Sequence, residues 1–235
     1  MKKVISALAL FYCIFLGTEY LFDNMMMTVA GAGEVVLAQN YILGISVAGF
    51  LLFPLVSRLI REKGGFLYIT GFVVTVVGIV CIFLIQQHLS YKMLMISGGV
   101  LFFILGLLGS AVHYMTAKCM GKSLYLARTV GTAYALGIFL QFLNNNLIKN
   151  DVLEAVVLTV FLTAFVILLL RWKAQETLVI DGMGKDQIED RYLVRNRGVA
   201  ACMLILIVAL MACIFASLDN AVTLVHAAGE VDVGQ

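Results

Sequence analysis

Seven long apolar runs, separated by short charged segments, dominate this sequence. They lie at 4–18 (extending to about 30 if Glu19 and Asp23 belong to the run), 35–57, 64–91, 93–117, 129–148, 155–170 and 198–218. A helix of roughly 20 residues crosses a hydrocarbon core about 30 Å thick. Barrel strands would alternate with period two, whereas these runs are apolar on every side. The runs predict an all-α, polytopic membrane bundle of about seven transmembrane helices.

The composition indicates that lipid is the main solvent of this chain. Hydrophobic residues make up 62% of the sequence and charged residues only 13%, and the mean hydropathy is +1.02. Soluble domains carry roughly 25% charged residues, so a soluble enzyme is excluded. The net charge of +2, without a continuous basic patch, gives no indication of a nucleic-acid partner. No metal-ligand spacing, phosphate loop or nucleophile motif occurs, so we expect no catalytic site, metal or cofactor.

Lysine and arginine are distributed unequally between the two ends of the predicted helices. If the N-terminus is inside, only Lys92 and Lys149 of the 16 basic residues fall on the outer side. The inner side receives Lys2, Lys3, Arg58, Arg61, Lys63, Lys118, Lys122, Arg128, Arg171, Lys173, Lys185, Arg191, Arg195 and Arg197. Because cytoplasmic loops carry the excess of basic residues, we expect a multi-pass protein of the cell membrane with a cytoplasmic N-terminus.

The outer end of the first run is repeated at the outer end of the seventh. Residues 23–39 align without gaps on residues 219–235, and eight of the seventeen positions are identical. The identities include Asp23 and Asn24, repeated as Asp219 and Asn220. Both copies follow a run of the same predicted orientation, so six helices form one unit and the seventh begins a second.

Two parallel six-helix halves joined by a long cytoplasmic linker resemble the major facilitator superfamily of secondary transporters. The resemblance implies an N-terminal six-helix bundle at 1–171, an inter-half linker at 172–197 and the first helix of a C-terminal half at 198–235. Gln235 aligns with Gln39, just before the bulk of the second helix. We therefore expect a partial chain of a truncated 12-helix architecture, whose missing partner is the rest of the C-terminal half.

The segment after the second predicted helix weakly resembles the cytoplasmic gating loop of that family. The family element has the form Gly-x-x-x-Asp-Arg-x-Gly-Arg-Arg, and residues 54–64 here read Pro-Leu-Val-Ser-Arg-Leu-Ile-Arg-Glu-Lys-Gly. Arg58 and Arg61 match the basic positions, whereas both glycines and the Asp are missing. The resemblance thus implies a gating role for the two arginines without the salt bridge that the family's Asp makes.

Small residues recur in two of the predicted helices. The fourth contains Gly106, Gly109, Ser110 and Ala111, which permit close helix approach. The fifth, with Arg128, Gly131, Ala135 and Gly137, resembles the small-residue fifth helix of the family. It lacks the Gly-Pro element of the family's drug/proton antiporters, so nothing favours that subclass.

Acidic residues at the outer end of the first helix are candidates for coupling to a cation or proton. Glu19 and Asp23 are four residues apart and share a helix face. If that face lines a cavity, either side chain could bind a cation or carry a proton, because charges within a span are costly. Alternatively Asp23 and Asn24, with their repeats Asp219 and Asn220, cap or hydrogen-bond neighbouring helices near the outer surface.

Further polar candidates occur in the fourth and fifth helices. His113 and Tyr114 could face a substrate or relay a proton, or His113 could be a hydrogen-bonded packing group. Gln141 and Asn144 share a face and could bind a polar substrate, or the run Asn144 to Asn146 could simply end the helix at the interface.

These features predict a secondary transporter that moves an unidentified small solute, with or without protons, by alternating access. The substrate itself is not predicted. Two other hypotheses remain: a membrane sensor whose transporter-like bundle signals through a cytoplasmic domain, and a complete seven-helix receptor or assembly factor.

Overall fold

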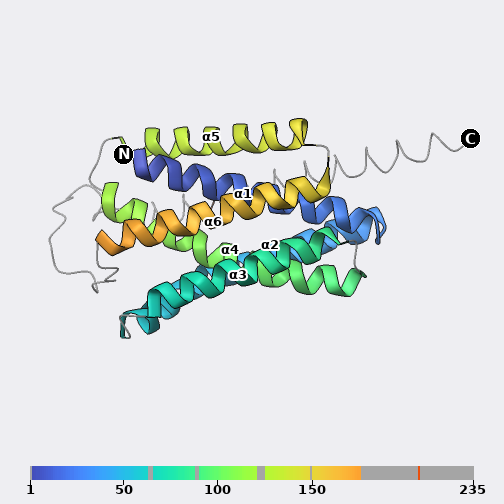
Figure 1. Cartoon of the computed structure of the whole chain (residues 1–235), viewed down its shortest axis with the longest axis horizontal. Coiled ribbons are helices and arrows are strands. Elements are labelled where there is room, and N and C mark those ends of the chain that lie inside the picture. The colour runs from blue at the N-terminus through green and yellow to red at the C-terminus, as the bar shows by residue number, and fades with distance from the viewer. Residues whose placement is uncertain are drawn as a thin grey trace, which may run out of the picture.

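Six α-helices joined by short connections make up the described part of this computed structural model (Figure 1). The structure describes residues 2–62, 66–87, 90–120, 125–148, 150–175 and residue 206. The helices are α1 (Lys2–Met27), α2 (Ala32–Glu62), α3 (Phe66–Gln86), α4 (Tyr91–Met120), α5 (Leu126–Leu147) and α6 (Asp151–Gln175). All six are long and apolar enough to cross a membrane, and these described residues contain no strand.

The predicted all-α membrane bundle is therefore confirmed for its first six helices. The seventh run at 198–218, the second repeat copy with Asp219 and Asn220, and the linker beyond Gln175 lie outside the described residues.

The helix ends differ from the charge-free runs, because charged residues remain helical at the edges of a span. α1 includes Glu19 and Asp23, and α6 extends from Asp151 to Gln175 instead of 155–170. The start of α6 is fixed by Asn150, whose side-chain oxygen accepts hydrogen bonds from the backbone N–H groups of Val152 at 2.9 Å and Leu153 at 3.3 Å. α3 ends at Gln86 instead of 91, where the polar pair Gln86 and Gln87 interrupts the apolar run.

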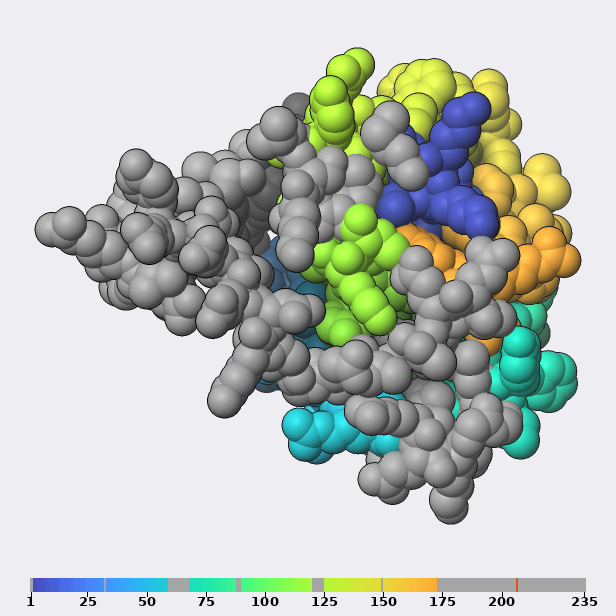
Figure 2. Space-filling model, turned by 90° about the vertical axis from the view of Figure 1, so that its left-hand side faces the viewer, coloured from blue at the N-terminus to red at the C-terminus, as the bar shows by residue number. Residues whose placement is uncertain are grey.

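Consecutive helices run in opposite directions along the bundle, as Figure 1 shows. α1, α3 and α5 begin at one end, here called the Lys2 end, and α2, α4 and α6 begin at the other, the Met27 end. Figure 2 looks onto the Lys2 end, where the first residues of α1 (blue) lie beside the end of α6 (orange). The arginines and lysines near helix ends gather there: Lys2, Lys3, Arg58, Lys118, Arg128 and Arg171. Lys92 is at the Met27 end, so the described helices preserve the predicted asymmetry of basic charge.

The larger helix contacts follow a two-fold pattern in which α1–α3 correspond to α4–α6, whereas the three weaker contacts among α1, α2 and α3 have no comparable counterpart among α4, α5 and α6. The two largest contacts are α2 with α4 and α1 with α5. When α1, α2 and α3 are replaced by α4, α5 and α6 and the reverse, each of these two contacts becomes the other. The contacts α3 with α4 and α1 with α6 exchange in the same way, whereas α3 with α6 and α1 with α4 map onto themselves. α1 and α4 lie at the centre, with 56% and 61% of their spans buried, against 22% to 39% for the other helices.

Glycines allow backbones to touch where the two largest contacts form. A Cβ added to Gly49 of α2 would collide with the Phe103 carbonyl of α4, and one added to Gly106 of α4 would collide with the Ser46 carbonyl of α2. At the α1–α5 crossing, a Cβ on Gly137 would lie 2.9 Å from the Ala9 carbonyl oxygen. The predicted close approach of the fourth helix through Gly106 is thus observed.

We expect Gly49→Ala to destabilise the bundle and Gly44→Ala not to. Both glycines lie within α2, where Ala raises intrinsic helix stability by up to about 1 kcal/mol. Gly44 has open space around it, so only Gly49→Ala forces α2 and α4 apart. The melting temperature of the full chain in detergent should fall for Gly49→Ala and stay level or rise for Gly44→Ala. Equal melting temperatures for the two variants would contradict the observed crossing.

Candidate functional site

A hydrogen bond between Tyr12 and His113 joins the two central helices. The Tyr12 hydroxyl oxygen of α1 lies 3.1 Å from Nε2 of His113 in α4. His113 Nδ1 lies 2.7 Å from the Gly109 carbonyl oxygen, one turn back on its own helix. A carbonyl oxygen only accepts, so a neutral His113 ring carries its proton on Nδ1 and accepts the Tyr12 O–H at Nε2.

Aromatic rings from three helices surround this pair. The His113 ring centroid lies 5.7 Å from that of Phe11 and 6.1 Å from that of Phe50, and the Tyr12 and Tyr134 centroids are 5.1 Å apart. Phe50 and Tyr134 are each 42% exposed, and His113 is partly buried. We call Tyr12, Phe50, His113 and Tyr134 the His113 site.

The His113 site is half-open and lies inside the Lys2 half of the bundle. Its residues are seven to twelve positions from that end, a depth of about 10 to 18 Å at 1.5 Å per residue. The ring faces and edges can contact an apolar surface of a ligand, and the Tyr12–His113 pair can exchange hydrogen bonds or a proton with it. Tyr114 is not part of this site, because its ring neighbour is Phe53, with centroids 6.3 Å apart.

A second polar contact joins α1 and α2 in the Met27 half. The Gln39 side-chain N–H group donates to a Glu19 carboxylate oxygen at 3.0 Å. Glu19, Asp23 and Asn24 are all partly buried along the same stretch of α1. The predicted acidic face therefore exists, and Glu19 has an uncharged partner on the neighbouring helix.

A third polar cluster, between α5 and α6, is closed to solvent. Asn144 donates from Nδ2 to a Glu154 carboxylate oxygen at 3.2 Å, and Gln141 donates from Nε2 to the Asn145 carbonyl oxygen at 2.5 Å. Gln141, Asn144 and Glu154 are 7%, 5% and 4% exposed. The side-chain carbonyl oxygens of Gln141 and Asn144 accept no hydrogen bond from the residues that the structure describes. We call these four residues the Glu154 cluster.

Glu154 is a site residue that the sequence reading missed. Its charge was taken as the boundary before the sixth span at 155, whereas it lies in the first turn of α6 and is almost fully buried. Within the described residues it forms no ion pair with a lysine or arginine. A pattern local to one helix could not reveal the contact between Glu154 and Asn144. An acidic residue next to an apolar run and four positions after the Asn150 cap was nevertheless a usable signal.

Arg58 is not brought to these sites, and Asp219 and Asn220 lie outside the described residues. Arg58 is exposed near the end of α2, and Arg61 lies in the last turn of that helix. The described residues hold no group of three or more His, Cys, Asp and Glu side chains that could bind a metal.

Comparisons with protein-family models, with curated proteins and with solved structures found no match for this chain. The assignment of function therefore depends on the sequence and on the geometry of these sites.

We expect Asn144→Ala to destabilise the protein more than Asn146→Ala. Both residues lie near the end of α5, but Asn146 is exposed and donates only to the Phe142 carbonyl of its own helix. Removing Asn144 leaves the buried Glu154 carboxylate without its donor, which costs about 1 to 3 kcal/mol.

Unfolding of the full chain in mixed micelles by increasing fractions of sodium dodecyl sulfate measures this difference. The Asn146→Ala variant should stay within about 0.5 kcal/mol of the unsubstituted chain, as surface changes usually do. A larger loss for Asn146→Ala than for Asn144→Ala would contradict the buried contact.

Proposed function

We propose that this chain is the first half, with the start of the second, of a secondary transporter of the major facilitator type. It would move a small solute between the two halves by alternating access, with the His113 site contributing to the substrate-binding surface.

The two-fold packing of the six helices is the observation that carries the proposal. Each half of such a transporter contains two three-helix repeats of inverted orientation. Consecutive helices alternate in direction and each repeat has three of them, so α4 runs opposite to α1. The correspondence between the α2–α4 and α1–α5 contacts is the pattern that inverted repeats require.

The position of the polar groups supports the same function. Ionisable groups within a span are costly unless they face a cavity or a partner. The central helices α1 and α4 carry Glu19, Asp23 and His113, and the His113 site stays half-open on the side where α2 and α5 present Phe50 and Tyr134. This surface would face the second half in the complete transporter.

Cysteine accessibility separates a water-filled cavity from a lipid-facing surface. Phe50 of α2 is 42% exposed and Phe72 of α3 is 70% exposed. In the proposed transporter Phe50 faces the substrate cavity and Phe72 faces lipid. With the complete reading frame in membrane vesicles and the native cysteines replaced, we expect Phe50→Cys to react with a charged, membrane-impermeant thiosulfonate and Phe72→Cys to remain unmodified.

Alternating access adds a requirement on sidedness. Phe50→Cys should react in right-side-out and in inverted vesicles, because the cavity opens to each side in turn. Reaction of Phe50→Cys from one side alone would favour a sensor bundle, and equal reaction at both positions would reject the cavity.

Uptake measurements test the role of the Tyr12–His113 pair. The complete protein is reconstituted in liposomes that contain a pH-sensitive dye, and sugars, carboxylates, amino acids and amines are screened for solute-dependent proton movement or isotope uptake. For a solute that is transported, Tyr12→Phe should raise the half-saturating concentration by about two- to tenfold, which is the effect of losing one hydrogen bond. Tyr68→Phe, at an exposed site on α3, is the matched control. Unchanged uptake in Tyr12→Phe would remove the pair from the binding surface.

A further inference from the structure

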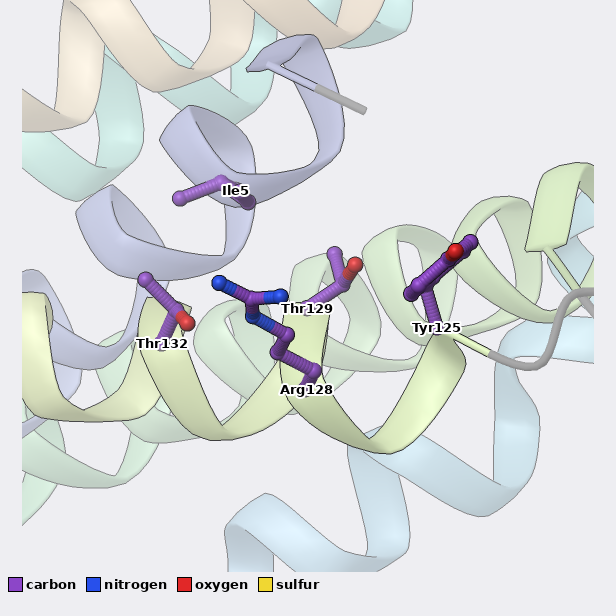
Figure 3. Close-up of a pocket in the computed structure, with 5 residues that line it drawn as sticks. All are labelled: Ile5, Tyr125, Arg128, Thr129 and Thr132. Carbon is purple, nitrogen blue, oxygen red and sulfur yellow. The ribbon is translucent and has the colours of Figure 1, made fainter.

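A pocket of about 450 Å³ lies between the beginnings of α1 and α5 at the Lys2 end of the bundle. Its walls include Ile5, Tyr125, Arg128, Thr129 and Thr132 (Figure 3). The volume is within the range of roughly 300 to 1,000 Å³ that small-molecule sites occupy. The pocket shares none of its described lining residues with the His113 site.

Among the described residues, the lining combines one cation with three hydroxyl groups. Figure 3 shows the Arg128 guanidinium group extending from α5 toward α1, between Thr129 and Thr132, with Ile5 on the opposite wall. Arg128 is exposed and forms no ion pair within the described residues. Arginine offers a planar set of N–H donors that matches the oxygens of a phosphate group.

Thr129 lacks a hydrogen bond that four other helical threonines among the described residues make, and it shares this lack with Thr159. The hydroxyls of Thr18, Thr75, Thr116 and Thr163 each donate to the carbonyl one turn back, at 2.8 Å. Thr129 is only 2% exposed, yet its hydroxyl has no hydrogen-bond partner among the described residues. Thr129 borders the pocket, so its hydroxyl is available to a ligand there.

The surrounding charge also favours an anion. α5 begins at Leu126, and Tyr125 before it supplies no side-chain cap, so the positive end of the helix dipole lies at the pocket. α5 contains no acidic residue, and α1 contains none before Glu19, whereas Lys2 and Lys3 precede Ile5 on α1.

We propose that this pocket binds a phosphate group, with Arg128 as the charged ligand and Thr129 and Thr132 as hydroxyl donors. The same chemistry is offered by inorganic phosphate and by the headgroup of an anionic phospholipid in the adjoining leaflet. In the second case the apolar wall at Ile5 would contact the lipid beyond its headgroup.

Thermal-shift titrations of the purified full chain in a neutral detergent test the site. The probes are sodium phosphate and dioctanoyl phosphatidic acid, each compared with sodium acetate at equal ionic strength. Phosphate, phosphatidic acid or both should raise the melting temperature in a saturable manner, and acetate should not. Stabilisation by both probes indicates that the phosphate group suffices, and stabilisation by the lipid alone assigns the site to a membrane headgroup.

Substitutions then locate the binding. Arg128→Gln should weaken the apparent affinity by about tenfold or more, because it removes a charge-assisted hydrogen bond. Arg171→Gln removes an exposed arginine from the same end of the bundle outside the pocket and should keep the full response. Thr129→Val preserves shape and charge, and it should also weaken binding measurably.

Three results would overturn the site: no shift with either probe, an equal shift with acetate, or a full response in Arg128→Gln. An undiminished response in Thr129→Val would likewise reject it, because the arginine alone would then attract any anion.

Discussion

Close backbone contact between helices is the constraint on which the rest of this structure depends. In lipid the hydrophobic effect cannot drive one apolar helix onto another, so association relies on packing and on polar contacts. Gly49 and Gly106 bring α2 against the backbone of α4, and Gly137 brings α5 against that of α1. These crossings produce the two largest contacts in the bundle, and they force α1 and α4 into its centre.

The central position of α1 and α4 decides which polar side chains stay accessible. Tyr12 and His113 satisfy each other, yet Phe50 and Tyr134 beside them remain partly exposed. Glu154 is instead buried where α5 and α6 meet α1, and its hydrogen-bond partner among the described residues is Asn144. The half-open surroundings of Tyr12 and His113 suit a ligand that binds and dissociates. The closed surroundings of Glu154 admit only a small species such as a proton unless the helices move apart.

The sequence was sufficient to predict the helices but not their contacts. Apolar length and the placement of Lys and Arg predict six of the described spans and their alternation, because these properties depend on the bilayer alone. Helix ends were less well predicted, since α6 starts at Asp151 and α3 stops at Gln86.

Hydrogen-bond partners on different helices could not be predicted, for a different reason. Tyr12 and His113 are 101 residues apart, and nothing local in either helix encodes their hydrogen bond. Tyr12 therefore was not singled out as a candidate, although His113 was. Glu154 was set aside because charge was used to mark the end of a span, and a buried carboxylate breaks that rule.

The larger contacts of the bundle allow Glu154 to be compared with the corresponding place in α3. α6 corresponds to α3 in the exchange of the larger contacts, although α3 also contacts α1 and α2 and α6 has no comparable contact with α4 or α5. The first turn of α3, residues 66–69, contains no carboxylate, whereas that of α6 contains Asp151 and Glu154. Symmetric packing therefore does not require an acid at this place. A carboxylate that is 4% exposed costs free energy to bury, and Asn144 and the N-terminal end of the α6 dipole offset part of that cost. In the proposed transporter this carboxylate would be a candidate for ion coupling, because acids within a span are costly unless they face a cavity or a partner.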